Sequence, residues 1–239
     1  MKTNILGVLF DNNTVEYAVA MAYNAVLENK RMFIVTPNPE IVNVACRDEE
    51  FKNILNSADI VTPDGIGIVY ASRLKGGNIK TRAAGFDIVC GIIENLDKTG
   101  GSVYLFGGKP GVADMAAQKL KEKYNGIVIA GTHNGYFDDD THIIADIAQK
   151  KPNLLLVCLG APKQEKWIYK NADKLSANVM IGAGGSIDVL AGSVKRAPDI
   201  FIKFGLEWFY RLIKQPSRIG RMLKLPLFLV KVMFTKQEV

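Results

Sequence analysis

The chain has 239 residues, 48% of them hydrophobic and 23% charged, with 30 Lys and Arg against 24 Asp and Glu. This ordinary globular composition excludes a disordered, collagen-like or disulfide-scaffold protein. The positive excess is uneven, because residues 1–194 carry 20 basic and 21 acidic side chains whereas residues 195–239 carry 10 and 3. The sequence therefore predicts two parts: a nearly neutral α/β domain, residues 1–194 (the body), and a basic segment, residues 195–239 (the appendage).

The cysteines and histidines are few. Cys46, Cys90 and Cys158 are widely spaced in apolar runs, which favours buried thiols in a reducing cytoplasm over a disulfide framework. His133 and His142 are the only two histidines, and so small a number argues against a histidine-rich metal site.

Short β-branched runs alternate with longer helical patterns along the body. The apolar start of the chain is too short for a signal peptide, so it is interpreted as a first strand. The expected strands cover residues 4–10, 32–36, 59–62, 102–106, 127–130, 154–159 and 178–181. The expected helices cover residues 14–29, 40–56, 65–75, 86–98, 111–124, 141–149, 164–173 and 186–191. This alternation predicts a Rossmann-like, mostly parallel sheet with helices on both faces.

Gly, Pro or polar residues follow six of the predicted strands. Ligands of open α/β sheets bind beyond the carboxyl ends of the strands, so these segments are expected to meet at one rim. They are residues 36–40, 62–65, 107–111, 131–136, 160–165 and 182–188.

Four of these segments allow both a chemical and a plain structural interpretation. Residues 107–111 suit a phosphate-binding turn as well as an ordinary tight turn. Asp64 suits a general base, although its position also suits a helix N-cap, the interpretation favoured without further information. Residues 138–140, three aspartates, are better explained by a solvated helix start than by a metal site. Lys163 and Gln164, in a first helical turn, could reach a ligand, whereas Glu165 suits solvated surface; spacing does not decide.

The appendage combines aromatic and basic side chains. Arg211, Lys214, Arg218 and Arg221 fall within about 80° of one another on a helical wheel, although Pro216 is expected to break that helix. Residues 223–234 form a second apolar stretch. A basic, aromatic amphipathic segment without a spanning run of about 18 apolar residues favours attachment to an anionic membrane surface. A C-terminal helix packed on the body is the alternative, and nucleic acid suits the interleaved apolar residues less well.

Taken together, the motifs resemble the WecG/TagA/CpsF family of bacterial glycosyltransferases, and they recur in order along most of the chain. They are Thr36–Glu40, Asp64–Gly67, Arg82 with Gly85 and Asp87, Phe106–Gly108, Gly135–Phe137, Gly160–Glu165, Arg196–Pro198 and Glu207–Arg211. One departure is Gln215–Arg218, where many members carry an acidic residue and a second arginine. The likeness is greatest to members that make the linkage unit of wall teichoic acid.

The resemblance implies transfer of N-acetylmannosamine from UDP to the 4-hydroxyl of N-acetylglucosamine on undecaprenyl diphosphate, with inversion and without a metal. It makes Asp64 the general base, with Thr36, Arg82 and Gln164 in the same pocket. The residues expected to bind UDP or substrate are Asn38, Gly107, Gly108, Tyr136, Lys163, Asp188, Arg211, Arg218 and Arg221. It also implies that the appendage completes the site at the inner face of the cell membrane.

Other interpretations stay open at this stage. Relatives that use N-acetylmannosaminuronic acid or glucose for capsule or enterobacterial antigen share the motifs. A non-catalytic peripheral membrane module would explain the appendage, and a homo-oligomer off the membrane would cover its apolar side chains. A nucleotide-dependent oxidoreductase is less favoured, because residues 10–13 after the first strand lack a GxGxxG turn.

Overall fold

The structure, a computed structural model, describes residues 2–203, 205–214 and 224–235. Its strands are β1 Thr3–Ile5, β2 Val8–Phe10, β3 Met32–Val35, β4 Ile60–Val61, β5 Ser102–Gly107, β6 Val128–His133, β7 Leu154–Cys158 and β8 Val179–Gly182. Its helices in the body are α1 Val15–Leu27, α2 Pro39–Ala45, α3 Glu49–Asn56, α4 Ile66–Leu74, α5 Gly85–Thr99, α6 Val112–Lys123, α7 Thr141–Lys150, α8 Lys163–Asn171 and α9 Ser186–Leu190. The appendage contributes α10 Asp199–Lys203, α11 Glu207–Lys214 and α13 Lys224–Phe234.

Six strands form one parallel sheet in the order β4-β3-β8-β7-β5-β6. The chain places β3 and β4 on one side and β5 and β6 on the other, and then returns so that β7 and β8 fill the centre. This arrangement confirms the predicted α/β fold with a parallel sheet. All strands end at one edge, which brings the exits of β3, β7 and β8 side by side.

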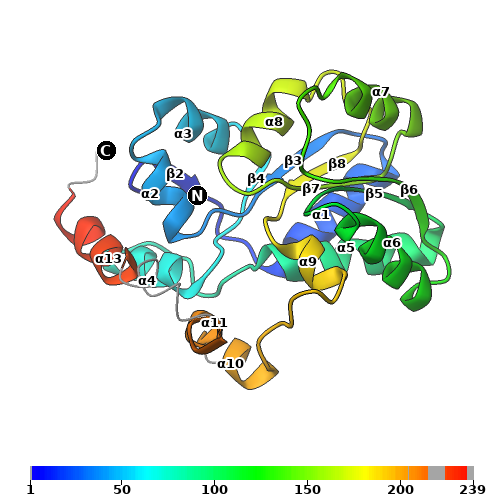
Figure 1. Cartoon of the computed structure of the whole chain (residues 1–239). Helices are drawn as coiled ribbons and strands as arrows, with labels where there is room; N and C mark the ends of the chain where they lie inside the picture. Colours follow the sequence, from blue (N-terminus) through cyan, green and yellow to red (C-terminus); the bar gives the residue numbers. More distant parts are fainter. Residues whose placement is uncertain (1, 204, 215–223, 236–239) are drawn as a thin grey trace.

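Helices cover both faces of the sheet, as Figure 1 shows. Alternate strand residues face opposite ways, so Leu155 and Val157 of β7 join the core beneath α3, α7 and α8, whereas Leu154 and Leu156 join the core beneath α1, α5 and α6. This explains why β7 is apolar at every position, since all five of its residues are buried.

Two predicted elements were wrong in extent. Residues 3–10 are not one strand of the main sheet but an antiparallel hairpin, because Leu6 and Gly7 both adopt positive φ angles of 53° and 89° and turn the chain back. The helix expected over residues 40–56 is divided into α2 and α3, because the Asp48 side chain accepts from the backbone N–H of Phe51 at 2.9 Å and starts a new helix.

Helix α13 folds back onto the body beside α4 and α2, as Figure 1 also shows. Phe228 and Val232 are buried in the core that α2 and α4 share. The alternative interpretation of the appendage was a C-terminal helix packed on the body. This interpretation is confirmed for one face of α13. Among the described residues, no helix has the length and apolar character needed to cross a membrane. The expected break at Pro216 lies outside the described residues.

Candidate active site

Backbone contacts join the segments that follow β3 and β4 to the start of α5. The N–H of Asp64 donates to Pro37 O at 3.2 Å, and the N–H of Ala83 donates to Pro63 O at 2.8 Å. Thr36 is buried, and its hydroxyl donates to Gly182 O of β8 at 3.3 Å. The structure thus brings Thr36, Asp64 and the segment that carries Arg82 to one part of the rim.

Asp64 lies half-buried just before α4. The helix begins at Ile66, and its N-cap position is Gly65, whose φ angle is +80°. The favoured interpretation of Asp64 as this N-cap is therefore wrong. A half-buried carboxylate at a strand exit suits proton abstraction from a bound hydroxyl.

Gln164 links two strand exits. Its side-chain oxygen accepts from the N–H of Gly160 at 3.2 Å and from the N–H of Gly184 at 3.1 Å. Its side-chain nitrogen donates to Glu165 Oε1 at 2.7 Å, and the residue is 2% exposed. Gln164 therefore holds the loops after β7 and β8 together, and its amide is oriented by its partners.

Sequence reasoning did not single out Glu165, for which it offered solvated surface and left the choice open. The residue is 1% exposed, and its Oε2 has no hydrogen-bond partner. Burial raises the pKa of this carboxyl to about 7. In the sequence Glu165 lies beside Lys166 in a polar first turn, and nothing local distinguishes it from an exposed glutamate.

Two ion pairs connect the appendage to the body. Arg82 contacts Glu207 of α11 at 3.0 Å and donates to Ile202 O at 3.4 Å. Arg196 contacts Asp87 of α5 at 2.6 Å and lies over the ring of Phe86. Arg82 thus serves as a tether for α11, whatever else it contacts when substrate is bound.

A hollow of about 710 Å³ lies beyond β5, β6 and β7. It brings together four of the predicted UDP-binding residues, Gly108, Tyr136, Lys163 and Asp188. Also lining it are Lys109, Gly135, Phe137, Asp138, Cys158 and Leu159. Lys163 places its ammonium over the Phe137 ring, 4.5 Å from the centroid. Lysines and backbone N–H groups at strand exits suit an anionic ligand.

Gly107, the last residue of β5, directly precedes Gly108 of this hollow. Its φ angle is +137°, and a Cβ there would collide with the carbonyl of Cys158 in β7. Only glycine allows the two strand ends to approach so closely. The next loop is then held in place, because the N–H of Gly135 donates to Gly108 O at 2.8 Å.

Asn38, expected to bind substrate, caps α2. Its side-chain oxygen accepts from the N–H groups of Glu40 and Ile41, both at 3.0 Å. The capping oxygen is therefore engaged within the protein, and Asn38 itself follows β3 two residues after Thr36.

The aspartates at 138–140 form the start of a helix, as expected. Asp140 holds the N-cap position of α7 and accepts from the Trp167 indole N–H at 2.7 Å, while Asp139 accepts from Thr141. Within the described residues, no group of three or more His, Cys, Asp or Glu side chains is placed to hold a metal ion. Metal independence stays a prediction.

Three predicted site residues of the appendage cannot be placed. The side chain of Arg211, and all of Arg218 and Arg221, lie outside the described residues.

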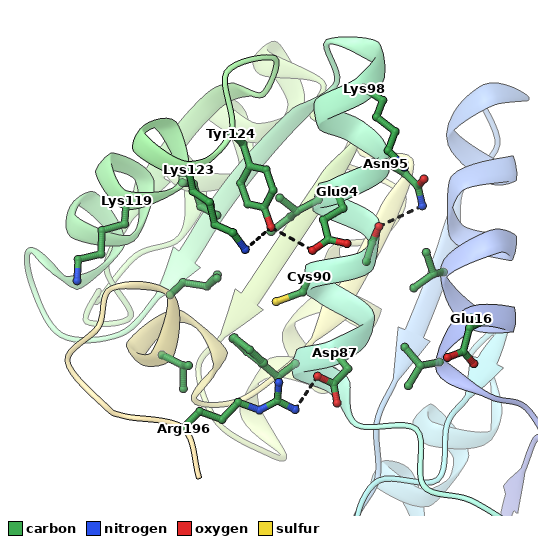
Figure 2. A pocket seen from close by; sticks show the side chains of 18 of the residues that line it. Glu16, Asp87, Cys90, Glu94, Asn95, Lys98, Lys119, Lys123, Tyr124 and Arg196 are labelled. Atoms are coloured by element: carbon green, nitrogen blue, oxygen red, sulfur yellow. Dashed lines mark hydrogen bonds and ion pairs between the residues drawn. The ribbon is translucent and has the colours of Figure 1, made fainter. Parts of the chain in front are cut away.

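A second hollow, of about 1150 Å³, runs along α5 between α1 and α6, as Figure 2 shows. None of the predicted site residues lines it. The Asp87–Arg196 pair lies at one end, and Lys123 donates to the Tyr124 hydroxyl at 2.7 Å farther along. Cys90 is half-buried there, as is Cys46 elsewhere, so full burial of the thiols was wrong for these two and right for Cys158.

The fold and the rim define a doubly wound α/β protein with a polar hollow at the carboxyl edge of its sheet, lined by two lysines and two aspartates as well as glycine backbone. The sequence model that represents the glycosyl transferase WecG/TagA/CpsF family matches residues 3–238 of this chain. The chain therefore belongs to this family. The predicted family membership is confirmed.

Among the relatives that carry the name N-acetylglucosaminyldiphosphoundecaprenol N-acetyl-beta-D-mannosaminyltransferase are proteins from three species. The protein from Bacillus spizizenii is 39% identical over 86% of this chain and 80% of its own length. The protein from Bacillus subtilis is 40% identical over 84% of this chain and 78% of its own length. The protein from Staphylococcus aureus is 35% identical over 100% of this chain and 94% of its own length.

Proposed function

We propose that this chain transfers N-acetylmannosamine from UDP to the 4-hydroxyl of N-acetylglucosamine on undecaprenyl diphosphate, forming the linkage unit of wall teichoic acid. The observation that carries the proposal is the match along the chain, because relatives named for this activity are 35–40% identical over at least 84% of it. A lipid-linked acceptor and a basic appendage support action at the inner face of the cell membrane.

The chemistry fits the residues at the rim. Inversion needs one base that takes the proton of the acceptor hydroxyl while the diphosphate departs from the opposite side, and Asp64 is suited to that role. Charge that develops on UDP is met without a metal by the backbone at Gly107 and Gly108 and by Lys163. The appendage carries further basic residues, Arg211, Arg218 and Arg221, and their assigned role is to meet the charge on the departing diphosphate.

The Arg82–Glu207 and Asp87–Arg196 pairs support a site completed by the appendage. Arg82 lies three residues before α5 and Asp87 lies in its first turn, and the N–H of Ala83 contacts Pro63 O, next to Asp64. These contacts of α10 and α11 support the proposal that the appendage borders the acceptor site.

The test is a transfer assay with a panel of UDP-sugars, a short-chain lipid diphosphate acceptor and EDTA throughout. Asp64→Asn is expected to lower turnover by about 10²–10⁴-fold, because it removes the base. Asp173→Asn is the matched control, since the Asp173 side chain is 94% exposed in a surface pair with Arg31. Full activity of Asp64→Asn would contradict the assigned base. A product that carries N-acetylmannosaminuronic acid or glucose would contradict the donor alone.

A further inference from the structure

The only two histidines of the chain meet in space. His133 ends β6 and His142 lies in the first turn of α7, and their Nε2 atoms are 3.2 Å apart. The rings are inclined at 60° with centroids 5.2 Å apart. His133 is half-buried with its ring edge-on to Phe106, whereas His142 is exposed.

A second contact orients the His133 ring. Its Nδ1 lies 2.7 Å from Asn134 O. A carbonyl oxygen only accepts, so Nδ1 donates in this contact, and Nε2 is the ring nitrogen that faces His142. Histidines that bind metals commonly donate their other ring N–H to a backbone carbonyl in this way.

The spacing of the two nitrogens also matches a chelate. Two imidazole nitrogens about 2.0–2.1 Å from a tetrahedral Zn²⁺ lie about 3.3 Å from each other. The two Nε2 atoms share a hydrogen bond in the structure, so an ion that binds both displaces the proton from the Nε2 that carries it. We infer that His133 and His142 form a two-histidine binding site for a late divalent transition-metal ion, with water completing the coordination.

The position of the pair gives binding a structural consequence. The two histidines stand at the ends of residues 134–140, which supply Gly135, Tyr136, Phe137 and Asp138 to the smaller hollow. A bound ion ties the end of β6 to the start of α7 and restrains this loop. The site has no part in the proposed transfer chemistry, which is assayed in EDTA, so the two proposals fail independently.

Calorimetric titration of the full chain with Zn²⁺ tests the inference. The wild type is expected to bind one ion per chain at this site. His133→Asn and His142→Asn are each expected to weaken that binding about a hundredfold, because a chelate gains its second contact intramolecularly. Mg²⁺, which prefers oxygen ligands, is the negative control, and Cys46→Ser shows whether a half-buried thiol contributes.

Two further readouts keep the result interpretable. Thermal unfolding without metal reports whether each variant folds, and paramagnetic resonance of the Cu²⁺-loaded wild type is expected to show coupling to two nitrogens. Zn²⁺ is expected to slow hydrogen exchange of residues 134–140 in the wild type only. Zn²⁺ affinity that is unchanged in both histidine variants, or no binding by the wild type, would overturn the inference.

Discussion

The Glu165 carboxyl shows how a single residue makes stability depend on pH. In the unfolded chain its pKa is near the ordinary 4.5, whereas burial in the folded protein raises the pKa to about 7. Between these values the folded state holds a proton that the unfolded state has lost. The free energy of unfolding is therefore highest below pH 4.5 as far as this group is concerned, and it falls as the pH rises toward 7.

Glu165→Gln is expected to remove this pH dependence, because glutamine stays neutral and can still accept from Gln164. Urea unfolding of wild type and variant at pH 5 and pH 8 measures the difference. The quantity of interest is the free energy of unfolding of the variant minus that of the wild type. This difference should be larger at pH 8 than at pH 5, by up to about 3 kcal/mol. Glu122→Gln is the control, since Glu122 is exposed on α6, and an identical pH response of the two variants would contradict the prediction.

At the scale of elements, α13 depends on a close approach between helices. A Cβ at Gly67 of α4 would lie 2.5 Å from Leu225 Cδ1 and 2.6 Å from Pro39 Cγ. Gly67 thus lets α13 and the first turn of α2 pack against α4 at one point. Asn38 lies just before α2, and Asp64 lies just before α4. The packing of α13 against these two helices therefore supports the backbone that carries both residues.

Two phenylalanines on α13 test this packing. Phe228 is 1% exposed and Phe234 is 78% exposed. Phe228→Ala is expected to cost about 3–5 kcal/mol of stability, because it leaves a cavity in the core, whereas Phe234→Ala should change it by less than about 0.5 kcal/mol. Urea unfolding gives the cost, and hydrogen exchange along α13 shows whether the helix detaches first. Equal effects of the two substitutions would contradict the packing.

The sequence predicted the elements whose signal is local. Continuous apolar runs between turn residues located β3 to β8, and the parallel order followed from the alternation with helices. The hairpin was missed because residues 5–10 are apolar on both sides of Leu6 and Gly7, without an Asn-Gly turn signal. The Arg82–Glu207 pair joins residues 125 apart in the chain, so no local pattern could separate its tethering contact from a role in the pocket.

At the scale of the whole molecule, the appendage buries one side of α13 and leaves apolar side chains exposed elsewhere. Leu227 is 67% exposed on α13, and Ile200 and Ile213 are 61% and 57% exposed on α10 and α11. The appendage as a whole carries 10 basic and 3 acidic residues. Exposed apolar groups in such a segment suit an anionic lipid surface, where acyl chains cover the apolar groups and headgroups attract the basic ones. Membrane attachment through residues 195–239 therefore remains the proposal that best accounts for this composition.

Flotation of the full chain with vesicles that contain anionic lipid tests this attachment. Leu227→Ser together with Phe234→Ser is expected to weaken binding about tenfold or more, because two large apolar side chains no longer enter the interface. Leu27→Ser on α1 is the control, since Leu27 is 64% exposed on the body and should have no effect. Added salt should weaken binding of the wild type by screening the basic side chains. If all variants lose vesicle binding equally, another surface meets the membrane. The same conclusion follows if binding changes neither with salt nor with the substitutions.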